Sequence, residues 1–106
     1  MQNLMTWAGR SKFSYNGSVK EGTEIIYGKG FTAKVSSEQY AKLLGFFSGK
    51  VVDIGTSRDT APRGSLGAWL KANVTKTAIA SYVGPILIQE GFGKKVGKSQ
   101  IKIESV

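Results

Sequence analysis

The spacing of apolar residues changes at Ser36, from the two-residue alternation of a strand to the three- and four-residue spacing of a helix. Phe31, Ala33 and Val35 alternate with polar residues, so they should share the buried face of a strand. Ser36 and Gln39 then have the spacing at which each side chain bonds the other's free backbone amide at a helix start. The chain is therefore predicted to fold as a mixed α+β protein.

Residues 12–35 should form a β-hairpin ahead of this helix. The turn signal Gly28-Lys29-Gly30 is flanked by TEIIY and FTAKV, whose β-branched and aromatic residues favour strands over 23–35. Residues 1–11 carry no comparable pattern and are expected to be a flexible arm, with Trp7 as its candidate anchor.

Three helical segments and a short strand are expected after Ser36. The first helix should end at Gly49, and residues 51–55 read as a strand. A second helix is predicted over 65–72 and a third over 75–90, with Thr75 as its cap. The apolar residues at helical spacing are predicted to be core: Tyr40, Leu43, Leu44, Phe47, Leu66, Trp69, Leu70, Ile79, Tyr82, Val83, Ile86 and Leu87.

Pro85 complicates the third helix, because proline lacks a backbone amide and clashes with the carbonyl of Ser81. If the helix breaks there, PILIQEG becomes a strand; if it only kinks, the helix runs on to Gly91. We favour the kink. The basic strand GKKV, the pair Gly97-Lys98 and the strand SQIKIE would then form a carboxyl-terminal β-hairpin.

The glycine- and lysine-rich stretch GFGKKVGKS is not a nucleotide-binding loop. A P-loop needs its first glycine five positions before the second, and the residue five positions before Gly97 is Phe92. A P-loop must also open a helix, whereas the residues after Ser99 alternate like a strand. The dinucleotide pattern fails as well, because Val96 stands where its third glycine belongs.

Composition excludes several classes of chemistry. The 106 residues contain no cysteine and no histidine, and the seven carboxylates are spread along the chain. We therefore expect no enzyme, no cofactor and no metal site. The length suits one domain, residues 1–106, and no stretch is apolar enough for a membrane span or a secretion signal. A soluble cytoplasmic protein is expected.

Charge is the strongest functional signal. The formal net charge is +8, from fifteen Lys and Arg against seven Asp and Glu. Between residues 57 and 102 the acidic residues are Asp59 and Glu90, and the basic ones are Arg58, Arg63, Lys71, Lys76, Lys94, Lys95, Lys98 and Lys102. Such a chain attracts polyanions, and nucleic acid is the expected partner. The alternative is a small interaction or inhibitor module, of the phage or mobile-element type, on an acidic protein surface.

The order helix, strand, helix, turn, helix, hairpin over residues 36–105 resembles the winged-helix DNA-binding domains, and LIQEGFGKKVGKSQIKI looks like the end of a recognition helix entering the wing. The resemblance implies that the third helix lies in the major groove of duplex DNA and that the wing contacts the backbone or minor groove. It favours DNA over RNA and is compatible with a homodimer. It implies groove-facing candidates Lys76, Thr77, Ser81 and Gln89, and wing candidates Lys94, Lys95 and Lys98.

Two departures and several ordinary interpretations stand beside that resemblance. Pro85 is unusual in a recognition helix, and Lys76 is the one basic residue on the polar face of the third helix, so base-specific reading should be weak. The alternative interpretation of the wing lysines is that they protect a sheet edge from pairing. Arg58 and Arg63, around Pro62, either contact phosphates or belong to a merely exposed loop. Lys71 completes the set of candidate binding residues.

Overall fold

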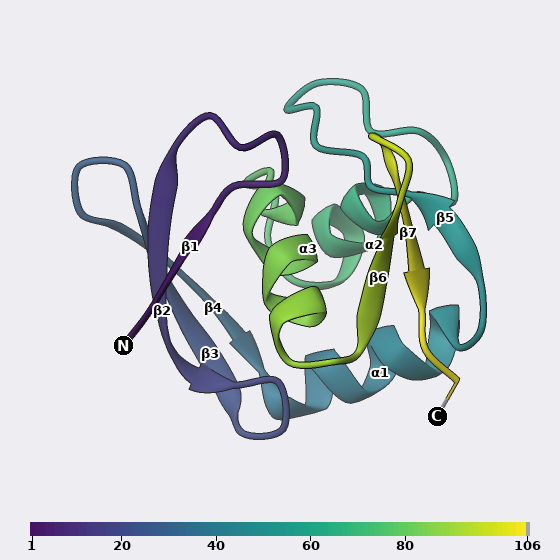
Figure 1. Ribbon diagram of the computed structural model, residues 1–106, viewed down its shortest axis with the longest axis horizontal. Helices are drawn as coiled ribbons and strands as arrows, with labels where there is room; N and C mark the ends of the chain where they lie inside the picture. Colours follow the sequence, from purple (N-terminus) through teal and green to yellow (C-terminus); the bar gives the residue numbers. More distant parts are fainter. Residues whose placement is uncertain (106) are drawn as a thin grey trace.

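The computed structural model describes residues 1–105 and shows three helices between two antiparallel sheets (Figure 1). The molecule measures 33 × 28 × 24 Å. The α+β fold class predicted from the sequence is thereby confirmed. None of the helices in the described range has the length and apolar character that a bilayer crossing requires.

The first sheet is a meander of four strands, β1 (Gln2–Met5), β2 (Lys12–Ser18), β3 (Gly22–Tyr27) and β4 (Phe31–Ser36), in the order β1-β2-β3-β4. The hairpin expected over 23–35 is present as β3 and β4. The expectation of a flexible arm over 1–11 was wrong, because β1 pairs with β2 and Trp7 is buried. The region 12–35 also contains three strands rather than one hairpin.

Helix α1 (Ser37–Phe47) begins where the periodicity changes. The Ser36 hydroxyl accepts the backbone amide of Gln39 at 3.1 Å, and the Gln39 side-chain oxygen accepts the backbone amide of Ser36 at 2.8 Å. This reciprocal capping confirms the prediction. Strand β5 (Val51–Asp53) and helix α2 (Leu66–Asn73) follow close to their expected positions.

Helix α3 (Ala80–Gln89) begins later than the predicted start at Thr75, which does not cap it. The backbone amides of Val74 and Thr75 both bond the Leu70 carbonyl, at 2.8 and 3.1 Å, and so close α2 instead of opening a new helix. Threonine is also a weak helix former, since its branched side chain is restricted against the preceding turn. Residues 75–79 are therefore a connection, in which Lys76 and Thr77 are exposed and Ile79 is buried in the core.

Pro85 neither breaks α3 nor leaves a backbone acceptor without a partner. The helix continues through it to Gln89. Because proline lacks the amide that would bond the Ser81 carbonyl, this carbonyl is free for another donor. The backbone amide of Trp7 supplies it at 2.9 Å. The proline thus creates the point at which the amino-terminal segment attaches to α3.

The second sheet has the order β5-β7-β6, with β6 (Gly93–Val96) and β7 (Gln100–Ile103) forming the carboxyl-terminal hairpin. Val96 pairs with Gln100, so the connection has three residues, Gly97 to Ser99, and the predicted two-residue turn was wrong. Strand β5 lies against β7 on the other side. We call the β6–β7 hairpin the wing.

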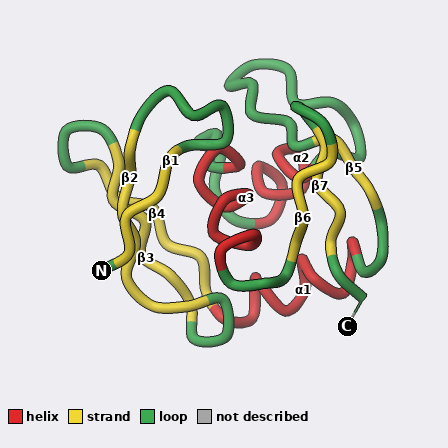
Figure 2. Tube along the Cα trace, viewed as in Figure 1, coloured by secondary structure: helices red, strands yellow, loops and turns green. Residues whose placement is uncertain are grey.

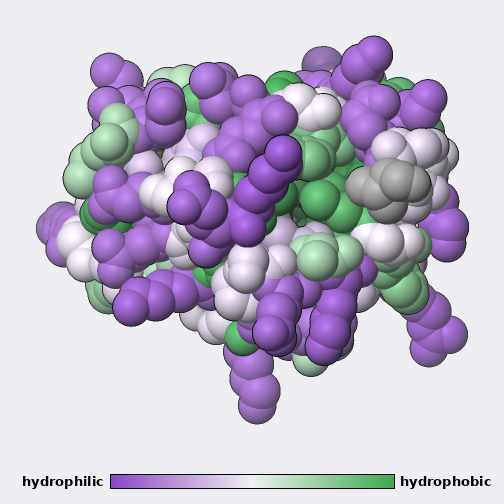
Figure 3. Space-filling model, turned by 90° about the horizontal axis from the view of Figure 1, so that it is seen from below, coloured by the Kyte–Doolittle hydropathy of each residue, from purple (hydrophilic) through white to green (hydrophobic). Residues whose placement is uncertain are grey.

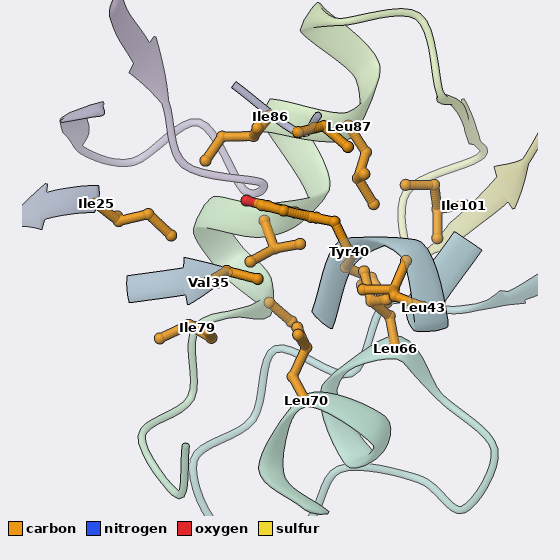
Figure 4. Packing of buried hydrophobic residues seen from close by; sticks show 14 of the residues in the cluster. Ile25, Val35, Tyr40, Leu43, Leu66, Leu70, Ile79, Ile86, Leu87 and Ile101 are labelled. Carbon is orange, nitrogen blue, oxygen red and sulfur yellow. The ribbon is translucent and has the colours of Figure 1, made fainter. Parts of the chain in front are cut away.

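One buried cluster joins the two sheets through the helices (Figure 4). Tyr40 of α1 lies among side chains from the first sheet, α2 and α3, and its hydroxyl is 2.7 Å from that of Thr23. Burial raises the pKa of Tyr40 well above its usual value. Of the side chains predicted to be core, Trp69 and Tyr82 are only half-buried. Phe31, expected on a buried strand face, is 63% exposed.

Two glycine substitutions test the packing around α3. A methyl group on Gly84 would lie 2.8 Å from the Trp7 ring and 2.8 Å from Ile54, whereas one on Gly45 of α1 would meet nothing within 4 Å. Gly84→Ala should therefore lower the free energy of unfolding by about 1–3 kcal/mol. Gly45→Ala should raise it by about 0.5–1 kcal/mol. Urea denaturation checks both, and equal effects would contradict the packing of Trp7 on α3.

Candidate functional site

Three connecting segments, residues 6–11, 54–65 and 97–99, come together at one end of the molecule, at the top of Figures 1 and 2. A fourth, residues 74–79, runs behind α3 up to the start of that helix and lines a groove with the 54–65 segment. We call these four segments the loop edge. Hydrogen bonds hold the 6–11 and 54–65 segments against the 97–99 segment. The Trp7 indole donates to the Lys98 carbonyl at 2.8 Å, and the Ile54 amide donates to the Ser99 carbonyl at 2.8 Å.

The loop edge is strongly cationic. Asp59 is the one carboxylate in its sequence, against five exposed basic side chains: Arg10, Arg58, Arg63, Lys76 and Lys98. Like charges held together on one side of a protein produce a field that attracts polyanions. Four of these five cations were sequence candidates, and Arg10 was missed because its segment was assigned to a flexible arm.

A groove of about 500 Å³ opens between the loop edge and the β3–β4 hairpin. It brings together four predicted site residues, Arg58, Lys76, Thr77 and Ser81. The remainder of its lining is Thr56, Ala78 and the aromatic residues Tyr27, Phe31 and Tyr82. The groove therefore combines cations, hydroxyl groups and aromatic rings. The binding site predicted from the sequence contained no aromatic residue.

The three aromatic residues of the groove form a continuous stack. Tyr27 lies between Phe31, with ring centroids 5.8 Å apart, and Tyr82, with centroids 4.7 Å apart. The interplanar angles are 29° and 25°. Phe13 contacts Tyr82 edge-on at 5.1 Å and holds that ring from the side of the sheet. Phe31 and Tyr27 are direct partners across β3 and β4, so the hairpin register sets the outer pair.

The electrostatics of Tyr82 place Arg58 near this stack. Burial raises the pKa of the Tyr82 hydroxyl, the neighbouring Tyr27 raises it further, and the positive charge of Arg58 acts in the opposite direction. The hydroxyl stays protonated at neutral pH and can donate a hydrogen bond. The groove thus holds a neutral aromatic wall beside a guanidinium group.

Two of the predicted binding lysines already have partners within the protein. The ammonium group of Lys71 donates to the carbonyls of Ser57 and Arg58, at 2.8 and 2.5 Å, and so holds the start of the 54–65 segment against α2. The ammonium group of Lys95 donates to the Trp7 carbonyl at 3.1 Å and lies 4.7 Å from the centre of its indole ring. Both lysines position the loop edge rather than extend from it.

The wing lysines do not share one surface. Lys95 pairs with the fully buried Ile101, so its side chain leaves the wing on the face towards the core and Trp7. Lys94 pairs with Lys102, so both point to the opposite face of the sheet. Of the wing candidates, Lys98 alone lies in the loop edge. Gln89 lies at the far end of α3, beside Pro85 and Lys95.

Glu90, one of the two acidic residues in the basic half of the sequence, has a structural role. Its carboxylate accepts the Tyr15 hydroxyl at 2.7 Å and the backbone amide of Val19 at 2.8 Å. Burial, followed by this hydrogen bond and the negative charge, raises the pKa of Tyr15. The end of α3 is therefore tied to the first sheet at both β2 and the turn that follows it.

Within residues 1–105, no group of three or more acidic side chains is placed to hold a metal ion. No protein-family model, curated protein or solved structure is similar enough to this chain to count as a match. The function is therefore inferred from the residues of the chain itself. Besides Arg10 and Thr56, the sequence reasoning missed the aromatic site residues Tyr27 and Phe31. Their one signal was their position on either side of the turn Gly28-Lys29-Gly30.

The different environments of Lys94 and Lys95 predict different effects on stability. Lys95→Met keeps the aliphatic stem but removes the contacts of the ammonium group with Trp7, so the free energy of unfolding should fall by about 1 kcal/mol. Lys94→Met is the matched control, and because it relieves a like-charge pair with Lys102, stability should stay constant or rise slightly. Urea denaturation of both variants checks this, and a Lys95→Met protein as stable as the wild type would refute the structural role.

Proposed function

We propose that the protein binds nucleic acid through the loop edge, with electrostatic docking on phosphate groups as the main source of affinity. The observation that carries this proposal is the concentration of five exposed cations in the loop edge, whose segments contain Asp59 as their one carboxylate. Asp53, which is exposed at the end of β5 next to Ile54, is a second carboxylate at this end of the molecule, and the balance stays positive. Phosphate contacts of this kind position a protein on nucleic acid without reading the sequence. Catalysis has no part in the proposal.

The element order supports a winged-helix-like unit over residues 36–105. Helix α1, strand β5, helices α2 and α3 and the wing follow one another in the order of the resembled family. By this resemblance duplex DNA is the proposed ligand. The tip of the wing, at Lys98, would then lie against the backbone, as would the connection that precedes α3.

Helix α3 itself offers little surface for insertion into a major groove. Its Ser81 carbonyl is bonded by Trp7, and Tyr82 is covered by Phe13 and Tyr27 of the first sheet. We therefore propose that the connection before α3, with Lys76, and the first turn of the helix take part in docking, and that the middle of the helix does not. The proposed contact residues are Arg10, Arg58, Arg63, Lys76, Thr77, Ser81 and Lys98.

Salt dependence tests the electrostatic proposal. Each phosphate that the protein neutralises contributes about −0.9 to the slope of log K against log salt on duplex DNA. The double variant Lys76→Glu/Lys98→Glu should weaken binding to every sequence and reduce the magnitude of the slope by about 2. Fluorescence anisotropy at several salt concentrations measures both quantities.

The matched control carries the same charge change on the opposite side of the molecule. Lys42 belongs to α1 and Lys20 to the β2–β3 turn, which lie together at the bottom of Figure 1; Figure 3 shows this face, where long hydrophilic side chains surround a small apolar area. Lys20→Glu/Lys42→Glu should retain most of the affinity. If both double variants lose affinity equally, net charge and not the loop edge explains binding. If the wild type binds no nucleic acid at low salt, the proposal fails, and the result favours the alternative of an acidic protein partner.

A further inference from the structure

We propose that the groove beside the loop edge holds an unpaired base of a nucleic-acid strand, stacked on the ring of Phe31, with an adjacent phosphate at Arg58 and Lys76. This inference rests on the proposed nucleic-acid binding and narrows its ligand. The preferred ligand is then a nucleic acid with at least one unpaired base, such as a single strand or a duplex with an overhang.

Phe31 is the first observation behind this inference. The strand pattern places its side chain on the face shared with the buried Val35, yet 63% of Phe31 is exposed. One face of the ring packs on Tyr27, and the rest of it is left exposed beside two cations of the groove. A local conflict between pattern and structure is expected at functional or strained sites. The ring lies at the groove, where a ligand could cover it.

The aromatic stack makes Phe31 a firm platform. Its ring rests on Tyr27, Tyr27 rests on Tyr82, and Tyr82 is held by Phe13 within the sheet. A ring that is already stacked loses little freedom when a base is added to it. Since every base has a π-face, such a platform accepts any sequence, which agrees with the scarcity of base-reading side chains.

The remaining lining of the groove suits a nucleotide. Its volume of about 500 Å³ falls within the range of about 300–1,000 Å³ typical of small-molecule sites. Arg58 and Lys76 supply positive charge for a phosphate, and the hydroxyls of Thr56, Thr77 and Ser81 can bond the edge of a base. A paired base inside a duplex exposes neither its face nor its pairing edge, so the groove selects for unpaired bases.

Fluorescence anisotropy with three labelled ligands tests this inference: a single-stranded oligonucleotide, the matching blunt duplex, and that duplex with a single-stranded overhang. Phe31→Ala should weaken binding of the single strand and of the overhang duplex by at least about fivefold, which is the lower end of what one base–aromatic stack contributes. Binding of the blunt duplex should not change. Phe31→Trp, which retains an aromatic face, should keep the wild-type preference.

Phe46→Ala is the matched control. Phe46 is also an exposed phenylalanine, at 56%, but it belongs to α1 and lines a different groove. This variant should bind all three ligands like the wild type. Phe31→Leu separates stacking from apolar bulk, because leucine fills space without a π-face, and it should behave like Phe31→Ala.

The outcomes separate this inference from the proposed function. If the wild type binds none of the three ligands, nucleic-acid binding itself fails, and the base site fails with it. If the wild type binds but Phe31→Ala weakens no ligand, or weakens all three equally, the base site is wrong and the electrostatic docking stands. Wild-type affinity in Phe31→Leu would also overturn stacking. Urea denaturation of each variant confirms that the compared proteins are folded.

Discussion

The attachment of Trp7 to α3 is the interaction on which the rest of the structure depends. Pro85 cannot donate to the Ser81 carbonyl, and the Trp7 amide takes the place of the missing donor. The indole nitrogen of the same residue donates to the Lys98 carbonyl, and the ammonium group of Lys95 lies over the indole ring. One buried residue therefore joins the amino-terminal segment, the first turn of α3 and the tip of the wing.

This attachment decides which charges act together. It brings the 6–11 segment, with Arg10, beside the wing tip, with Lys98, and Lys71 holds the segment of Arg58 in place from α2. The first sheet, fixed against α3, contributes Tyr27 and Phe31 to a groove whose cations come from the helical unit. The candidate site thus belongs to both parts of the chain, and neither the sheet nor the three-helix unit carries it alone.

Sequence reasoning recovered the features that depend on neighbouring residues. Ser36 and Gln39 marked the start of α1 because capping is local, and the β3–β4 hairpin followed from its turn. Strand β1 was missed because QNLM has no alternating apolar pattern and is held by pairing with β2. The late start of α3 depends on amides that bond back to Leu70, which no spacing rule reveals.

The candidate site was predictable only in part for the same reason. Clustering of Arg58 with Lys76 requires the fold, although charge alone identified both residues. Lys94 and Lys95 are adjacent in sequence and were expected to act together, but a strand sends them to opposite faces. Phe31 was assigned to the core, since its exposure depends on where the hairpin ends relative to α3.

Amide chemical-shift mapping by NMR, with an unlabelled overhang duplex added to the isotope-labelled protein, tests the central claim most directly. The claim is that the segments joined through Trp7 form one nucleic-acid-binding surface. The account predicts that the largest shifts fall in residues 6–11, 28–31, 56–63, 75–82 and 97–99, and that α1 changes little. Largest shifts along α1 and the β2–β3 turn, with the loop edge unaffected, would contradict it.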